Sequence, residues 1–182
     1  MTKQAIITVF GSSRPREGDR DYEEARALGR ILAENGLAVC SGGYGGVMAG
    51  VSQGVKEAGG KTYGVTAAFF SARVNPWIDV EVRVGTWQER LFELIRLADG
   101  FVACKGGTGT LVELAVVWEM LNKSVTTAKP FAVLGDFWQP ILERVREVEL
   151  EHPGPWGEAQ GRLVHVAAAP GDVAHHLLER LK

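Results

Sequence analysis

Short apolar runs alternate along the chain with longer segments in which apolar residues recur at helical spacing. The short runs predict strands over residues 5–10, 37–40, 62–66, 79–84, 100–104, 131–134 and 163–166. The periodic segments predict helices over residues 21–35, 46–58, 86–97, 108–121, 137–149 and 172–181. Thr86 and Glu89 predict a capping box for the third helix, and Asp172 is the expected N-cap of the last helix.

The regular alternation of strands and helices predicts an α/β fold of the three-layer, Rossmann-like type. The ranges above give a mostly parallel sheet of about seven strands, with helices on both faces. Most of the strands are continuously apolar, as strands buried on both faces are, whereas residues 79–84 alternate and indicate a half-exposed strand. We expect residues 1–182 to form a single nucleotide-binding domain.

Two segments interrupt this alternation and carry aromatic residues. Residues 67–77 include Phe69 and Phe70, and residues 151–162 include Trp156 among prolines and glycines. Long loops in compact domains often act as lids or as partner surfaces, so both segments are candidates for such a role.

Glycine clusters at the ends of two predicted strands. The strand at 37–40 runs into SGGYGG (residues 41–46), and the strand at 100–104 runs into KGGTGT (residues 105–110). Ligands of open parallel sheets bind beyond the carboxyl ends of the strands, and a helix N-terminus offers free N–H groups to a phosphate. Neither loop has the dinucleotide or P-loop spacing, and no acidic residue ends the strand at 62–66 to hold a second ribose. The pattern therefore predicts a site for a mononucleotide or a phosphosugar.

The phosphate is expected on backbone N–H groups and hydroxyls of these loops. The candidate binding residues are Gly106, Gly107, Thr108, Gly109, Thr110, Lys105, Gly43, Tyr44, Gly45 and Gly46, together with Ser12, Ser13 and Arg14 after the first strand. Two interpretations remain open for Lys105, which either pairs with the phosphate or is an exposed turn residue. Tyr44 likewise either stacks on a base or packs within its turn.

Charge and cysteine usage exclude several classes of protein. A net charge of −2 without a basic stripe argues against a nucleic-acid or membrane-surface partner. The two cysteines lack a CxxC spacing and are expected to be small buried apolar residues, and the four histidines form no ligand pattern. No apolar stretch reaches the length of a membrane span. We therefore expect a soluble, cytoplasmic protein that needs no metal and no cofactor.

Three segments resemble the LOG family, whose members were formerly called lysine decarboxylases. KGGTGTLVE (residues 105–113) resembles the PGGxGTxxE signature of that family. SGGYGGVMAGVSQGV (residues 41–55) is similar to its first glycine-rich loop and helix, and VFGSSR (residues 9–14) to its first strand and loop. The resemblance implies a Rossmann-like fold, a homodimer or higher homo-oligomer, and a small nucleotide as substrate. Characterised members hydrolyse nucleoside 5′-monophosphates, notably those of cytokinins, to free base and ribose 5-phosphate.

The same resemblance implies two catalytic residues. The family has a catalytic Glu that closes the motif, which corresponds to Glu113, and a catalytic Arg on the preceding helix, which corresponds to Arg90. A carboxylate beside the ribose can stabilise the positive charge that develops when an N-glycosidic bond breaks. Two positions depart from the family: Lys105 stands where the motif has Pro, and Leu91 follows Arg90 where plant-type members have Lys.

Two functions are therefore compatible with the sequence. The first is hydrolysis of the N-glycosidic bond of a nucleoside 5′-monophosphate. The alternative is a nucleotide- or phosphosugar-binding protein that performs no turnover. DNA processing, which distant Rossmann-like relatives perform, is disfavoured by the charge of −2.

Overall fold

The computed structural model describes residues 4–151 and 162–181, so most of the loop expected at residues 151–162 lies outside the described residues. The strands are β1 (Ile6–Phe10), β2 (Ala38–Ser41), β3 (Thr62–Ala67), β4 (Val80–Val84), β5 (Gly100–Ala103), β6 (Phe131–Leu134) and β7 (His165–Ala167). The helices are α1 (Arg20–Glu34), α2 (Val47–Glu57), α3 (Trp87–Leu97), α4 (Thr108–Asn122), α5 (Gln139–Glu151) and α6 (Pro170–Arg180).

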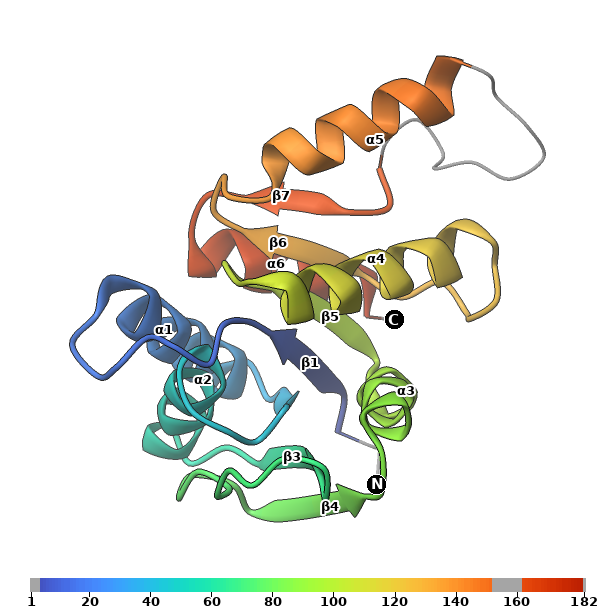
Figure 1. Cartoon of the computed structure of the whole chain (residues 1–182). Helices are drawn as coiled ribbons and strands as arrows, with labels where there is room; N and C mark the ends of the chain where they lie inside the picture. Colours follow the sequence, from blue (N-terminus) through green and yellow to red (C-terminus); the bar gives the residue numbers. More distant parts are fainter. Residues whose placement is uncertain (1–3, 152–161, 182) are drawn as a thin grey trace.

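The seven strands of the described chain form one parallel sheet in the order β4-β3-β2-β1-β5-β6-β7 (Figure 1). The predicted α/β, Rossmann-like fold is thus confirmed. β4 lies at one edge and alternates between half-buried and exposed residues, as its sequence indicated. The two strands that precede the glycine loops, β2 and β5, are not adjacent, because β1 lies between them.

The helices divide between the two faces of the sheet and create two separate cores. In one core, Leu28 of α1, Val51 of α2 and Leu177 of α6 pack on the face of the sheet to which Ile7 and Val9 of β1 point. The other core takes side chains of α3, α4 and α5. Because successive strand residues point to opposite faces, each central strand contributes to both cores.

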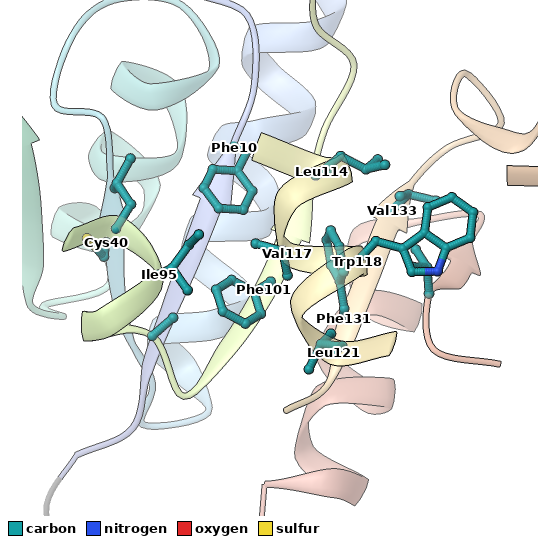
Figure 2. Close-up of a cluster of buried hydrophobic side chains, with 14 of the residues drawn as sticks. Phe10, Cys40, Ile95, Phe101, Leu114, Val117, Trp118, Leu121, Phe131 and Val133 are labelled. Carbon is teal, nitrogen blue, oxygen red and sulfur yellow. The ribbon is translucent and has the colours of Figure 1, made fainter. Parts of the chain in front are cut away.

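Aromatic rings fill the centre of the second core (Figure 2). Phe10 and Phe101 stack with their ring centroids 6.2 Å apart, and Phe131 meets Phe101 edge-on at 5.8 Å. Leu114 and Trp118 of α4 pack beside these rings. This cluster fixes the position of α4 on the sheet, and therefore the position of the loop from which α4 begins.

Both expected helix caps involve the predicted residues, but one of them acts differently. The Thr86–Glu89 capping box is confirmed, since the Glu89 N–H donates to the Thr86 hydroxyl over 3.1 Å and the Thr86 N–H donates to the Glu89 carboxylate over 2.9 Å. Asp172 is not the N-cap of the last helix. α6 begins at Pro170, whose fixed φ suits the first helical turn, and the Asp172 carboxylate accepts a hydrogen bond from the Ala169 N–H.

The structure bears on two further expectations: that the cysteines are buried, and that no segment spans a membrane. Cys40 and Cys104 are both buried, as expected, and belong to different cores on opposite faces of the sheet. Among residues 4–151 and 162–181, no helix is both long and apolar enough to cross a membrane.

Candidate functional site

A cavity of about 910 Å³ opens at the carboxyl ends of the central strands. It receives residues from the segments that follow β1, β2, β3, β5 and β6, and from the start of α3. β1 and β5 are neighbours whose following helices, α1 and α4, cover opposite faces of the sheet. This is the topological switch point at which open α/β sheets bind their ligands.

The loop after β5 forms one wall of the cavity. Gly106, Gly107, Thr108, Gly109 and Thr110 all line it, as predicted for the phosphate site. α4 begins here without a side-chain cap, so the N–H groups of its first turn are not covered by a capping side chain. Open space surrounds the Cα atoms of Gly107 and Gly109, where no atom would meet an added Cβ. The wall therefore has the form of an anion site at a helix N-terminus.

The loop after β1 lies against this wall. Ser12, Ser13 and Arg14 all line the cavity. The Ser12 N–H donates to the Lys105 carbonyl oxygen over 3.2 Å, which ties the loops of β1 and β5 together. The Ser12 hydroxyl accepts from the Arg14 N–H over 3.2 Å. The structure thus brings these three predicted residues to the same cavity as the glycine loop.

Lys105 lines the cavity but is not a free cation. Its Nζ lies 3.1 Å from Oδ2 of Asp21 on α1, and its side chain is 54% exposed. Asp21 and the nearby Asp19 also line the cavity. A phosphate near Lys105 would therefore compete with a carboxylate that is already in place.

Arg90 and Glu113 meet inside the cavity, although they come from different helices. Nη1 of Arg90 lies 3.8 Å from Oε1 of Glu113. Arg90 is only 7% exposed, and its Nε donates to the Val65 carbonyl oxygen over 2.8 Å. Burial raises the pKa of Glu113 to about 7, and the positive charge of Arg90 acts in the opposite direction, to lower it. Such a carboxyl group changes its charge near neutral pH, as acid–base residues of enzymes do.

The first glycine-rich loop supports Arg90 more than it lines the cavity. A Cβ on Gly42 would overlap Nη2 of Arg90, so any other residue here would force the guanidinium to move. Tyr44 lines the cavity, but its ring lies beneath the Arg90 guanidinium and its hydroxyl accepts from the Ala67 N–H over 3.1 Å. Tyr44 therefore packs within its turn.

Three predicted binding residues of that loop do not line the cavity: Gly43, Gly45 and Gly46. Gly43 and Gly46 have φ of +75° and +68°, which favours glycine. A Cβ on Gly46 would also overlap the carbonyl oxygen of Ser12. Backbone conformation explains the glycine at position 43, and backbone conformation together with close packing against the β1 loop explains the one at position 46; Gly45 has no such structural explanation.

Several cavity residues were not predicted from the sequence. They are Gly11, Pro15, Asp19, Asp21, Met48, Phe70, Ala72, Trp87 and Phe137. Phe70 and Ala72 belong to the loop at 67–77, for which the length of the loop and its aromatic residues were the sequence signals. Within residues 4–151 and 162–181, no group of three or more His, Cys, Asp or Glu side chains is arranged to hold a metal ion.

The chain is similar in sequence to enzymes of known activity. The chain is 36% identical over 145 residues to the cytokinin riboside 5′-monophosphate phosphoribohydrolase LOG of Oryza sativa subsp. japonica; the match covers 75% of this chain and 58% of the rice protein. It is 27% identical over 154 residues to the cytokinin riboside 5′-monophosphate phosphoribohydrolase of Rhodococcoides fascians, with 80% of this chain and 76% of that protein covered. The names of these relatives support a relationship between this chain and a family of nucleotide phosphoribohydrolases.

A solved structure matches over almost the whole chain. The molybdenum cofactor binding protein of Rippkaea orientalis is 25% identical, with a TM-score of 0.77 and 98% of each chain covered. The SLOG cluster4 family matches residues 4–150, which include the cavity walls and the Arg90–Glu113 pair. The expected resemblance to LOG proteins is confirmed, and the chain belongs to the SLOG cluster4 family.

Proposed function

We propose that this protein is a cytoplasmic phosphoribohydrolase that cleaves nucleoside 5′-monophosphates, AMP among them, into free base and ribose 5-phosphate. One observation carries the proposal: a buried carboxyl group with a raised pKa, Glu113, faces Arg90 in the same cavity as the uncapped N-terminus of α4. Two parts of a nucleotide therefore have complementary groups within one site: the phosphate would bind at the N-terminus of α4, and the sugar would lie near Glu113.

Each group has a distinct role in the proposed reaction. The N–H groups of residues 107–110 and the hydroxyls of Thr108 and Thr110 hold the phosphate. This orients the sugar with its anomeric carbon toward Glu113. As the bond from that carbon to the base nitrogen breaks, the carboxylate stabilises the developing positive charge on the sugar and orients the attacking water. Water adds a hydroxyl to the anomeric carbon, and its remaining proton goes to the leaving base.

Arg90 serves the carboxyl group in this scheme. Without Arg90, burial would hold more of Glu113 in the neutral form, which cannot stabilise a cation. The guanidinium keeps a share of the side chain ionised at neutral pH. Cleavage is therefore expected to rise with pH through about 7, where Glu113 loses its proton.

The proposal is tested by incubating the protein with AMP, GMP, CMP and a cytokinin riboside monophosphate, with adenosine as a control. Release of free base together with an equal amount of ribose 5-phosphate supports the proposal. Adenosine should not react, because it lacks the group that α4 holds. If all four nucleotides stay intact while at least one of them binds, the hydrolase proposal fails.

The second candidate is binding without turnover, and one comparison favours it. The similarity to the molybdenum cofactor binding protein covers 98% of both chains, whereas the rice relative is matched over 58% of its length. A cavity of about 910 Å³ is also large for a mononucleotide. Tight binding of molybdenum cofactor, without cleavage of any nucleotide, would favour this function.

We also propose a homodimer, formed through the outer surface of α3 and α4. Val112, Val116 and Met120 follow one another along α4 at helical spacing and remain only partly buried. Phe92 of α3 is 55% exposed. A second copy of the chain would cover these side chains. Sedimentation analysis of the parent and of Phe92→Glu tests this, since the charged variant should be monomeric where the parent is dimeric.

A further inference from the structure

The guanidinium of Arg90 lies against two aromatic rings that also contact each other. Its Cζ atom is 5.5 Å from the ring centroid of Tyr44 and 5.7 Å from that of Phe70. The two rings meet edge to face with their centroids 5.7 Å apart. A guanidinium at this distance over a ring face is attracted by the negative charge of the π-system. Two such contacts act here on a side chain that is almost fully buried.

The rings come from two loops that are joined to each other. Asn75 is 8% exposed; its backbone N–H donates to the Gly43 carbonyl oxygen over 2.8 Å, and its Nδ2 donates to the Tyr44 carbonyl oxygen over 2.9 Å. The Tyr44 hydroxyl is held at Ala67, at the start of the same loop. The loop at 67–77 is therefore fixed to the first glycine loop, and Phe70 is held over Arg90.

We propose that Tyr44 and Phe70 are positioning residues, an aromatic clamp that fixes the Arg90 guanidinium so that it faces Glu113. The role of this clamp in catalysis rests on the proposed function. The position of the two rings against Arg90 does not depend on that function. Arg90 has two further anchors: the hydrogen bond from Nε to the Val65 carbonyl oxygen, and a long one from Nη2 to the Met48 sulfur at 3.9 Å. Because a thioether sulfur is a weak acceptor, these two bonds alone leave the guanidinium plane free to tilt. The two rings restrict this tilt and keep Nη1 on the side of Glu113.

The charges around Glu113 make the clamp measurable. Arg90 is the charged group that acts on the pKa of Glu113, against the effect of burial. The other charged side chains that line the cavity are Arg14, Asp19, Asp21 and Lys105. Lys105 is paired with Asp21, and Asp19 accepts a hydrogen bond from the Arg16 N–H. If Arg90 becomes more mobile, its charge acts less on Glu113, and the pKa of Glu113 therefore rises.

The test replaces Phe70 with a residue that keeps most of its apolar volume. Phe70→Leu removes the ring face but retains most of the apolar volume, and Phe70→Tyr keeps the ring. Val74→Ala is the matched control, because Val74 lies in the same loop, is 38% exposed and does not line the cavity. Two signals are followed by NMR in the whole protein: the mobility of the Arg90 Nε–H group, and the titration of the Glu113 carboxyl carbon.

In Phe70→Leu, Arg90 should become more mobile and the Glu113 midpoint should rise by about half a pH unit. This is smaller than the shift of about one to three units that an adjacent arginine produces in full. Phe70→Tyr and Val74→Ala should behave like the parent. Unchanged mobility and midpoint in Phe70→Leu, or a midpoint that falls, would overturn the proposal.

A further measurement needs no variant and covers the case in which Phe70→Leu does not fold. Ring currents of Tyr44 and Phe70 should shift the guanidinium proton signals of Arg90 in the parent to high field. Signals at the positions of a solvent-exposed arginine would contradict the clamp.

The outcome for the clamp is separable from that for hydrolysis. If the protein cleaves nucleotides, the midpoint of kcat/KM against pH should move upward in Phe70→Leu together with the NMR midpoint. If no nucleotide is cleaved, the proposed function fails, and the NMR signals still decide whether the clamp exists.

Discussion

Glu113 is a buried carboxyl group. Among the described residues, the positive charge that acts on it is that of Arg90, whose Nη1 lies 3.8 Å from Oε1 of Glu113. Burial disfavours its charged form by more than Arg90 favours it, so its pKa rises to about 7. In the unfolded chain the same group titrates at about its ordinary value of 4.5. The folded protein therefore holds a proton on Glu113 in a pH range where the unfolded chain does not, which links stability to pH.

We predict that Glu113→Gln changes the pH dependence of unfolding. A group with a raised pKa contributes stability that is complete below pH 4.5 and is lost as the pH rises through about 7. Gln does not titrate, so the variant should gain stability relative to the parent between pH 4 and pH 8, by roughly 3 kcal/mol. Urea unfolding of both proteins at the two pH values measures this. Parallel pH profiles would show that Glu113 has an ordinary pKa.

Lys105 and Asp21 lead to a paired prediction about binding. The Lys105 ammonium at the edge of the proposed phosphate site is engaged by Asp21 at 3.1 Å, in a position where solvent partly screens both groups. Lys105→Ala should weaken AMP binding by about 1–2 kcal/mol, as the loss of a charge-assisted hydrogen bond does. Asp21→Asn should strengthen binding, because it removes the competing carboxylate. Isothermal titration measures both, and two unchanged affinities would place Lys105 outside the phosphate site.

Among the elements, the turn from β2 into α2 shows how packing rather than ligand contact requires glycine. Gly42 lies against the guanidinium of Arg90, where a Cβ would overlap Nη2 and come within 2.6 Å of the Met48 sulfur. The sequence showed a glycine cluster and favoured a phosphate site. It did not show that a helix much further along the chain brings Arg90 into this turn, since that contact is made only in the folded sheet.

We predict that Gly42→Ala displaces Arg90 and lowers activity. The added methyl group costs about 1–3 kcal/mol in a packed interior, and Arg90 must move to make room for it. If Arg90 moves away from Glu113, hydrolysis of AMP should fall at least tenfold while the protein remains folded. Gly171→Ala, at a position with open space around its Cα, serves as the control. Turnover equal to that of the control would show that the position of Arg90 is not critical.

The element boundaries show what pattern can and cannot predict. Apolar runs and periodic segments located all thirteen elements of the described chain, because each must bury one face or one stripe. The Thr86–Glu89 capping box was also predictable, because it is a local arrangement of two residues. Asp172 was assigned the wrong role, because an acidic residue in the first turn and an N-cap look alike without the backbone, and Pro170 decided between them.

On the scale of the whole molecule, the site forms because parallel strands end at one edge. Residues 12–14, 90, 105–110 and 113 are distant in sequence, yet the order β2-β1-β5 brings them to one cavity. The strand–glycine–helix pattern was sufficient to place residues 106–110 in the cavity, whereas the same pattern after β2 wrongly indicated Gly43, Gly45 and Gly46 as cavity residues. The pairing of Lys105 with Asp21 and the position of Tyr44 beneath Arg90 were not predictable, because both depend on how α1 and α3 dock on the sheet.

The central claim is that the Arg90–Glu113 pair acts in catalysis and not only in binding. The most direct measurement compares the parent with Glu113→Gln in AMP affinity and in the rate at which adenine is released. The account predicts that both proteins bind AMP with similar affinity, while adenine release by the variant is slower by about 10²–10³-fold, because the lost charge acts mainly in the transition state. Equal rates of adenine release, or binding by the parent without any release, would contradict it.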